Sequence, residues 1–238
     1  MLYSNLYFSA DESLAMVALL PMTPDAPLPM PPDCPHWAYG DDIGVLPRIF
    51  EDDITLAVME RTLPEALRDS VAAQLPPAAR LDWHWRGAPG EAMRADLRRH
   101  LPAPDRAAAL LDDIGTIASA LAFLFDTETI GIRLRRLDEA MCPRFHVDNL
   151  PVRLVTTYAG PGSEWLPEHA VNRAGLGAPR ADKPEIVTDP GAIGRLGAGD
   201  LALLKGDGWI GNEGRGLVHR SPQPAPGETR LLLALDPG

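Results

Sequence analysis

The segment Cys142-Pro-Arg-Phe-His-Val-Asp-Asn-Leu-Pro151 organises our interpretation of the chain, because it carries a histidine and a carboxylate two residues apart. We predict one strand over residues 144–148 and a second over residues 152–158. Side chains alternate between the two faces of a strand, so His146 and Asp148 are expected to project from the same side. An imidazole and a carboxylate side by side supply two of the three ligands of a facial metal triad.

The third ligand should come from a distant strand, and we predict that it is His219, in the segment Gly-Leu-Val-His219-Arg-Ser-Pro. Arg230 follows eleven residues later in an otherwise apolar strand. A His-x-Asp pair alone is weak evidence, since about 0.8 His-x-acid pairs are expected by chance from six histidines and 33 acidic residues. The combination is more informative, because the pair begins a run of strands and the other two residues lie near the end of that run.

Two imidazoles and one carboxylate bind a metal on one face and leave its other positions open. This suits non-haem Fe(II), which has to bind a cosubstrate and O₂ together, whereas a structural zinc site uses four protein ligands. Arg230 is suited to hold the far carboxylate of a dicarboxylate cosubstrate through paired, charge-assisted hydrogen bonds. The alternatives for Arg230 are an ion pair with an acidic residue or a position that faces solvent.

Composition narrows the class of protein. The 238 residues, 45% of them apolar, fit one domain with an N-terminal elaboration. A formal net charge of −11 argues against nucleic acid and against an anionic membrane surface as partners. The sequence contains no apolar run of 18 residues, and Met1 to Leu20 lacks the basic region of a signal peptide, so we expect a cytoplasmic protein.

We predict that the N-terminal half consists of an extension followed by a mixture of helices and strands. Residues 1–40 are predicted to be an extension that ends in a proline-rich connector, and residues 41–238 a single domain. The periodicity of apolar residues predicts strands over 54–60 and 81–86 and helices over 64–75, 91–100 and 105–125. The last of these helices has an apolar face and should lie across a sheet.

From residue 129 onward the pattern is one of short strands. We predict them over residues 130–137, 144–148, 152–158, 186–188, 201–204, 217–219 and 229–235. So many short strands behind a helical half predict an α+β fold in which a cupin-like double-stranded β-helix (jelly roll), mainly residues 129–236, is buttressed by helices. Residues 160–165 are predicted as a loop. The loops at 163–183 and 209–216 are expected to rim the pocket.

Other residues with chemical potential have simpler interpretations. Cys34 and His36 lack a second ligand pair, so we favour a loop that packs its tryptophan on the domain over a zinc site. His84, between two tryptophans, is interpreted as a sheet-edge histidine. Cys142 is interpreted as a buried structural thiol. Arg144 and Arg153 are cations near the site, and we favour structural salt bridges for them over binding of an acidic substrate.

Several motifs resemble those of the bacterial domain-of-unknown-function family numbered 1826. They are Cys142-Pro-Arg-Phe-His146-Val-Asp148, Arg153-Leu-Val-Thr-Thr-Tyr158, Gly160-Pro-Gly-Ser-Glu-Trp165-Leu and His219-Arg-Ser-Pro222. The resemblance covers about residues 40–236, nearly the whole chain. The family has no established activity, although some members are associated with zinc homeostasis. The C-terminal half is also similar to Fe(II)/2-oxoglutarate-dependent dioxygenases, in which a His-x-Asp pair, a later histidine and an arginine recur in this order.

The dioxygenase resemblance implies a role for each candidate residue. His146, Asp148 and His219 would ligate Fe(II), and Arg230 would bind the C5 carboxylate of 2-oxoglutarate. Tyr158 or Thr156 would donate a hydrogen bond to the same carboxylate. The implied function is an oxygenase that hydroxylates an unknown small-molecule or acidic substrate. Two alternatives remain open: a non-catalytic, cupin-like protein that handles zinc, and a structural barrel with a vestigial site.

Overall fold

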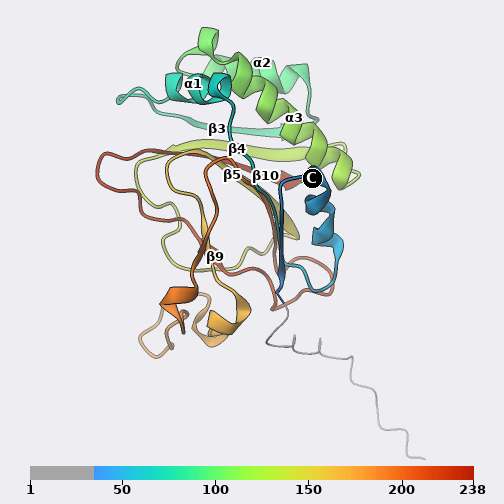
Figure 1. The fold of residues 1–238 in the computed structure, drawn as a ribbon, viewed down its shortest axis with the longest axis vertical. Helices are drawn as coiled ribbons and strands as arrows, with labels where there is room; N and C mark the ends of the chain where they lie inside the picture. The colour runs from blue at the N-terminus through green and yellow to red at the C-terminus, as the bar shows by residue number, and fades with distance from the viewer. Residues whose placement is uncertain (1–34) are drawn as a thin grey trace, which may run out of the picture.

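A seven-stranded sheet runs through the molecule, in the strand order β1-β2-β8-β5-β10-β4-β3 (Figure 1). The computed structural model describes residues 35–238. Neighbouring strands of this sheet are antiparallel, except for the parallel pair β1 and β2. The strands are β1 (Trp37–Gly40), β2 (Leu56–Met59), β3 (Asp82–Gly87), β4 (Ile130–Leu137), β5 (Val152–Ala159), β8 (Leu201–Lys205) and β10 (Arg230–Pro237).

A smaller sheet faces part of the large one and has the order β7-β6-β9. Its strands are β6 (Glu164–Trp165), β7 (Gly194–Arg195) and β9 (His219–Arg220), and an antiparallel bridge between His146 and His219 adds one more segment beside β9. From β4 onward the chain therefore passes back and forth between the two sheets. This winding makes a double-stranded β-helix, and the predicted α+β jelly-roll fold is confirmed.

Three helices cover the outer face of the large sheet (Figure 1). They are α1 (Glu65–Ala73), α2 (Glu91–His100) and α3 (Ala108–Leu124). Short 3₁₀ turns connect other elements: η1 (Ile43–Phe50), η2 (Pro104–Arg106), η3 (Glu168–Ala170), η4 (Arg173–Gly175) and η5 (Pro190–Ala192). The apolar face predicted for α3 is buried against the sheet, as expected for a helix in this position. No helix among residues 35–238 has both the length and the apolar character needed to cross a bilayer.

Alternation along the central strands separates a packing face from a pocket face. On β10, Leu231, Leu233 and Leu235 belong to the core beneath the helices. Arg230, Leu232 and Ala234 point the other way, into a pocket between the sheets. This split follows from the period of two along a strand.

Three short elements differ from the prediction. Residues 144–148 form no strand apart from the bridge at His146, and the carbonyl of Asp148 accepts a hydrogen bond from the Asp207 amide (2.9 Å) in a turn. Residues 186–188 are reduced to one bridge, and residues 160–165 are not all loop, because β6 pairs with two strands. Pairing with distant segments sets such boundaries, which local sequence does not encode.

The N-terminal end of the described chain includes a strand that was not predicted. Trp37 was expected in a loop, but it begins β1, which pairs with β2 at one edge of the large sheet. Its ring contacts Trp165 of the small sheet, with centroids 5.1 Å apart, so the tryptophan does pack on the domain. Cys34 and the proline-rich connector lie outside the described residues. The division of the chain at residue 40 stays a prediction, and β1 lies on its N-terminal side.

A buried ion pair ties α3 to the loops at the sheet. Arg61 donates two hydrogen bonds to the Asp113 carboxylate (2.7 and 3.0 Å) and a third to the carbonyl of Gly199 (2.6 Å). The Tyr158 hydroxyl donates to the same carboxylate (2.7 Å). Removing the negative charge leaves a half-buried guanidinium without its counterion, which is strongly destabilising.

We expect Asp113→Asn to lower the free energy of unfolding by about 3 kcal/mol, measured by urea denaturation. The neighbouring Asp112→Asn is the matched control, because Asp112 pairs with Arg94 on the surface and its side chain is 72% exposed. Exposed pairs contribute about 0–1 kcal/mol, so this control should stay close to the wild-type value. Equal losses in the two variants would contradict a structural role for the buried pair.

His36 is a satisfied core histidine, which agrees with the interpretation that favoured packing over zinc. Its Nδ1 atom lies 2.6 Å from the Thr55 hydroxyl, and its Nε2 atom accepts a hydrogen bond from the Glu168 amide (2.9 Å). Burial lowers the pKa of His36 from 6.5 to about 4. The unfolded chain therefore takes up a proton below pH 6.5 that the folded protein does not, and stability is lost as pH falls from 6.5 to 4.

This loss predicts a measurable change in the pH dependence of stability. We expect His36→Gln to destabilise the protein at pH 7 but to lose about 3 kcal/mol less than wild type between pH 6.5 and 4. Urea denaturation across this pH range, with the exposed His169→Gln as control, provides the measurement. Parallel stability curves for wild type and His36→Gln would contradict the assignment.

Candidate metal centre

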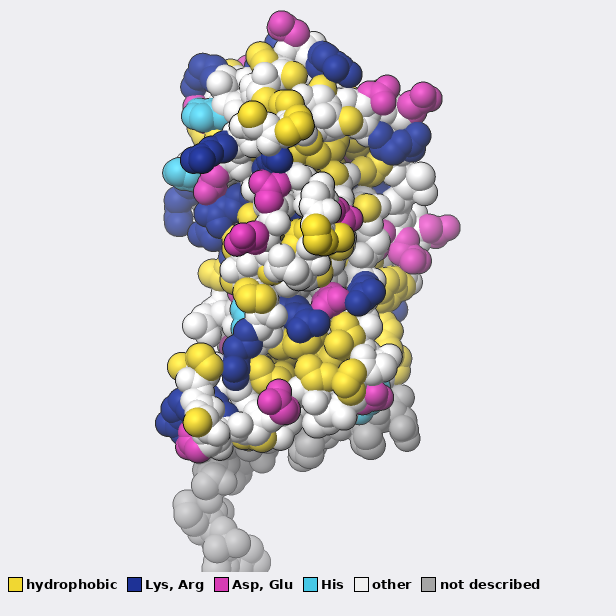
Figure 2. Space-filling model, turned by 90° about the vertical axis from the view of Figure 1, so that its left-hand side faces the viewer, with side chains coloured by type: hydrophobic (Ala, Val, Ile, Leu, Met, Phe, Trp, Pro, Cys, Tyr) yellow, Lys and Arg dark blue, Asp and Glu magenta, His cyan; other side chains and the backbone are white. Residues whose placement is uncertain are grey.

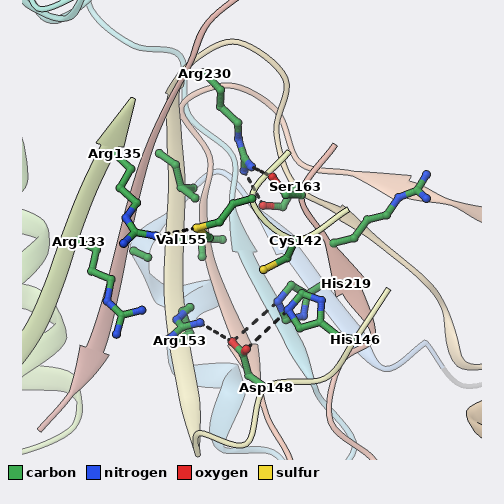
Figure 3. A pocket seen from close by; sticks show the side chains of 15 residues that line it. Arg133, Arg135, Cys142, His146, Asp148, Arg153, Val155, Ser163, His219 and Arg230 are labelled. Atoms are coloured by element: carbon green, nitrogen blue, oxygen red, sulfur yellow. Dashed lines mark hydrogen bonds and ion pairs between the residues drawn. The ribbon is translucent and has the colours of Figure 1, made fainter. Parts of the chain in front are cut away.

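Three side chains predicted as metal ligands converge at one side of the pocket (Figure 3). One ligand atom from each of His146, Asp148 and His219 lies within 4.8 Å of the other two. The Nε2 atoms of the two histidines are each 3.9 Å from a carboxylate oxygen of Asp148. This separation is too long for a hydrogen bond, so the three groups face a common point without bonding to one another.

The backbone explains why residues so far apart in the sequence meet. The amide of His146 donates to the carbonyl of His219 (3.0 Å), and the amide of His219 donates to the carbonyl of His146 (2.9 Å). Directly opposed residues of an antiparallel pair put their side chains on the same face. The two rings accordingly lie side by side, with centroids 4.6 Å apart. Asp148 then reaches the same point from two residues beyond His146, just before the chain bends at residues 149–151.

Hydrogen bonds at the far side of each imidazole orient the rings. The Nδ1 atom of His146 lies 3.0 Å from the carbonyl oxygen of Arg144, and that of His219 lies 3.1 Å from the carbonyl oxygen of Leu217. Carbonyls only accept, so each Nδ1 carries the proton and each Nε2 lone pair is free to face Asp148. Histidine ligands of metals are commonly oriented in this way. Burial also lowers the pKa of His219 to about 4, which keeps its imidazole neutral.

Arg153 holds Asp148 in place. It donates one hydrogen bond to the Asp148 carboxylate (2.8 Å) and two to the carboxylate of Asp236 on β10 (2.7 and 2.9 Å). One guanidinium is thus shared between two carboxylates, as the favoured salt-bridge interpretation of Arg153 predicted. For Arg144 the predicted salt bridge is wrong, because among residues 35–238 its side chain forms no ion pair and donates instead to the carbonyl of Gly175 (2.6 Å).

Arg230 is the unusual cation of this pocket. Its side chain is 1% exposed and donates to the hydroxyl groups of Ser163 (2.7 Å), Ser221 (2.9 Å) and Thr157 (3.1 Å). No carboxylate pairs with it among residues 35–238, so neither the ion pair nor the solvent-facing position left open from the sequence is found there. Burial lowers the pKa of Arg230 from 12.5 to about 10.

The two hydroxyl donors assigned beside Arg230 are wrong. Tyr158 lies in the core under the helices and donates to Asp113, and Thr156 pairs across the sheet with Leu233 of the same core. The hydroxyl next to Arg230 belongs to Thr157. Had Arg153 been taken as a pocket residue, alternation would have selected Thr157, since positions 153 and 157 share a face.

The pocket has a volume of about 340 Å³, within the usual range for small-molecule sites. Cys142 lines it, so the interpretation of this residue as a buried thiol was wrong. Of the two loops expected to rim the pocket, only Ser163 contributes to the lining. The loop after β8 is directed elsewhere, and Trp209 packs against Phe50 with ring centroids 5.6 Å apart. Ser163 and Ser221, which bind Arg230, were not predicted as site residues, although both lie in motifs quoted for the family resemblance.

Comparison with known proteins gives a family and a set of solved structures. A family model described as "Protein of unknown function (DUF1826)" matches residues 40–236, as the motifs predicted. No curated protein matches the chain. Matching solved structures include a rice dioxygenase for auxin oxidation (15% identity, 84% of this chain and 81% of that chain, TM-score 0.43). Another is a Pseudomonas putida prolyl-4-hydroxylase (16% identity, 81% and 96%, TM-score 0.39).

A third match is a non-heme alpha ketoglutarate dependent carbocyclase from nogalamycin biosynthesis (12% identity, 82% of this chain and 82% of that chain, TM-score 0.39).

We expect the purified protein to bind about one Fe(II) or Zn(II) ion, and His146→Ala and His219→Ala to abolish this binding. Changes in outer-shell partners alone cost roughly 10–100-fold in metal affinity, so loss of a ligand should cost more. Metal content after dialysis, together with calorimetric titration, measures the effect. His169→Ala removes an exposed histidine outside the cluster and should bind like wild type. Unchanged stoichiometry in the two cluster variants would rule out this centre.

Proposed function

The chain belongs to the DUF1826 family, and we propose that it is a non-haem Fe(II)- and 2-oxoglutarate-dependent oxygenase. The observation that carries the proposal is the pairing of two features in one pocket. A convergent His-Asp-His cluster lies on one wall, and a buried arginine without a counterion among the described residues lies on another. The first feature suits a metal with open positions, and the second suits an anion that has to be held beside it.

The ligand set fits an iron site of this kind. His146, Asp148 and His219 offer two nitrogen donors and one carboxylate, and each Nε2 atom already lies 3.9 Å from a carboxylate oxygen. Three protein ligands leave further positions for a chelating cosubstrate and for O₂. Arg153 restrains the carboxylate ligand, and two backbone carbonyls restrain the imidazoles. The metal centre would therefore need little rearrangement on binding.

Arg230 supplies the reason for preferring an oxygenase over a zinc-handling protein. A buried guanidinium whose partners among residues 35–238 are all hydroxyl groups is costly to maintain, and its lowered pKa corresponds to about 3 kcal/mol. A metal carrier has no need for such a group, whereas a dicarboxylate bound through its 2-oxo acid end needs its far carboxylate held. The guanidinium of Arg230 is held in the pocket by hydrogen bonds to the hydroxyl groups of Ser163, Ser221 and Thr157.

Each residue then has a defined task. The cluster binds and orients Fe(II), and Arg230 fixes the C5 carboxylate of 2-oxoglutarate, with Thr157 beside it. The bound metal and cosubstrate together supply O₂ activation for hydroxylation of a C–H bond, with release of succinate and CO₂. Val155 and Leu232 line the space between and keep it apolar, which strengthens the electrostatic interactions of Arg230.

The proposal predicts opposite effects of one substitution on binding and on stability. Arg230→Met removes the buried charge but keeps a side chain of similar length. We expect it to lower 2-oxoglutarate affinity at least about 100-fold, because a desolvated charge pair is lost. The ligand-free protein should be as stable as wild type or more stable, because replacing a buried charge by an apolar group is often neutral or favourable.

Anaerobic titration of the Fe(II) protein with 2-oxoglutarate provides the test, through the visible charge-transfer band of the chelated complex. The band should appear in wild type and be lost in Arg230→Met. Arg220→Gln is the matched control, because this arginine also lines the pocket but is already paired with Glu164 (2.7 Å). Absence of the band in wild type, with tight zinc binding instead, would favour the zinc-handling alternative.

A further inference from the structure

Five arginines line the pocket, and one of them is left without a defined partner. Arg153 is held by two carboxylates, Arg220 by Glu164, and Arg135 by Asp82 (2.9 Å), while Arg230 binds three hydroxyl groups. Arg133 has no hydrogen-bond or ion-pair partner within the part of the chain that the structure describes. Figure 3 shows Arg133 and Arg135 on the side of the pocket opposite the two histidines.

The register of the sheet explains why Arg133 is unpaired among the described residues. On β10 it lies opposite Ala234, and on β3 it lies opposite His84, an exposed histidine on the edge strand, as predicted. Neither neighbour is acidic. The next acidic residue on β10 is Asp236, and both of its oxygens are taken by Arg153. Among the described residues, no carboxylate on a neighbouring strand therefore pairs with Arg133.

Arg135 has weakly held partners and supplies a second cation: it pairs with Asp82 and donates to the sulfur of Met141 (3.0 Å). Its partner Asp82 is 65% exposed, and such surface pairs contribute about 0–1 kcal/mol. Exchange of this partner for a ligand anion would therefore cost little. Arg133 and Arg135 are two residues apart on β4 and project from the same face, toward the pocket.

The floor between these arginines and the metal centre is apolar. Val155, Leu232 and Ala234 line it. The charge of the lining also contrasts with the formal net charge of the whole chain, which is −11: within the described residues, three of the five lining arginines pair with carboxylates, and Arg133 and Arg230 do not. The charges of Arg133 and Arg230 create a local positive field that attracts anionic ligands. On the wider surface, in the view of Figure 2, basic side chains and histidines gather along one margin of the upper half of the molecule.

We propose that Arg133, with Arg135 beside it, binds an anionic group of the substrate. The substrate class is a small molecule with a carboxylate or phosphate at one end and an apolar part that lies over Val155, Leu232 and Ala234. The apolar part would thus extend from the arginines toward the metal centre. This inference rests on the proposed oxygenase function, since it assigns the substrate side of the same pocket. It is independent of Arg230, which holds the cosubstrate.

The test separates the charge of the ligand from its shape. Protein loaded with Zn(II) and saturated with 2-oxoglutarate, so that Arg230 is occupied, is titrated calorimetrically with three probes. These are phenylacetate, its neutral amide phenylacetamide, and phenyl phosphate. We expect at least one of the two anions to bind, and the amide to bind at least about tenfold more weakly, because a charge-assisted hydrogen bond is lost. The ratio between the two anions distinguishes a carboxylate site from a phosphate site.

Two variants locate the binding site. Arg133→Gln should weaken the preferred anion about tenfold or more and leave 2-oxoglutarate affinity unchanged. Arg80→Gln removes the same charge from an exposed arginine outside the pocket lining and should behave like wild type. Equal affinity for acid and amide, unchanged anion affinity in Arg133→Gln, or no binding of either anion would each overturn the inference.

The same experiment distinguishes this inference from the function on which it rests. If 2-oxoglutarate fails to bind, the proposed oxygenase function fails, and the probes are titrated into the Zn(II) protein alone. Anion binding that depends on Arg133 would then still support the subsite. If 2-oxoglutarate binds and Arg133→Gln changes nothing, the oxygenase proposal stands and the anionic substrate does not.

Discussion

Two reciprocal hydrogen bonds between His146 and His219 are the constraint on which the site depends. They pair a short irregular segment with β9, and by doing so they set the two imidazoles side by side. Asp148, two residues further along the same segment, reaches the same point. The edge of the small sheet therefore also determines the spacing of three groups that face a common point.

The two faces of the large sheet have different roles: one packs against the helices and stabilises the fold, and the other lines the pocket. Leucines of β10 and Tyr158 of β5 pack beneath the helices, where Asp113 and Arg61 add a buried ion pair. The opposite face of the same strands carries arginines and apolar floor residues into the pocket. A substitution in the pocket can thus change binding without reaching the core, because successive side chains of a strand point in opposite directions.

The arginines of the pocket differ in whether nearby carboxylates neutralise their charge. Arg153 is matched by two carboxylates, so it contributes to stability and holds Asp148 in position. Arg230 is more deeply buried than Arg153 but has only hydroxyl partners among the described residues, so its charge is left for a ligand. Arg133 lies at the exposed end, where the described chain offers it no defined partner. We assign separate roles to the three arginines because Arg153 is neutralised by carboxylates, whereas Arg230 and Arg133 have no carboxylate partner among the described residues.

The sequence by itself determined what depends on local spacing. The periodicity of two separated Arg230 from Leu231, the helical period identified the buried face of α3, and the His-x-Asp pair marked two of the converging groups. The tertiary structure alone decided which partners each group meets. It placed Thr157 rather than Tyr158 beside Arg230, directed Arg153 to Asp236, and reduced residues 144–148 to a single bridge. The reason is that alternation is a property of one strand, whereas register and bulges are fixed only when distant strands pair.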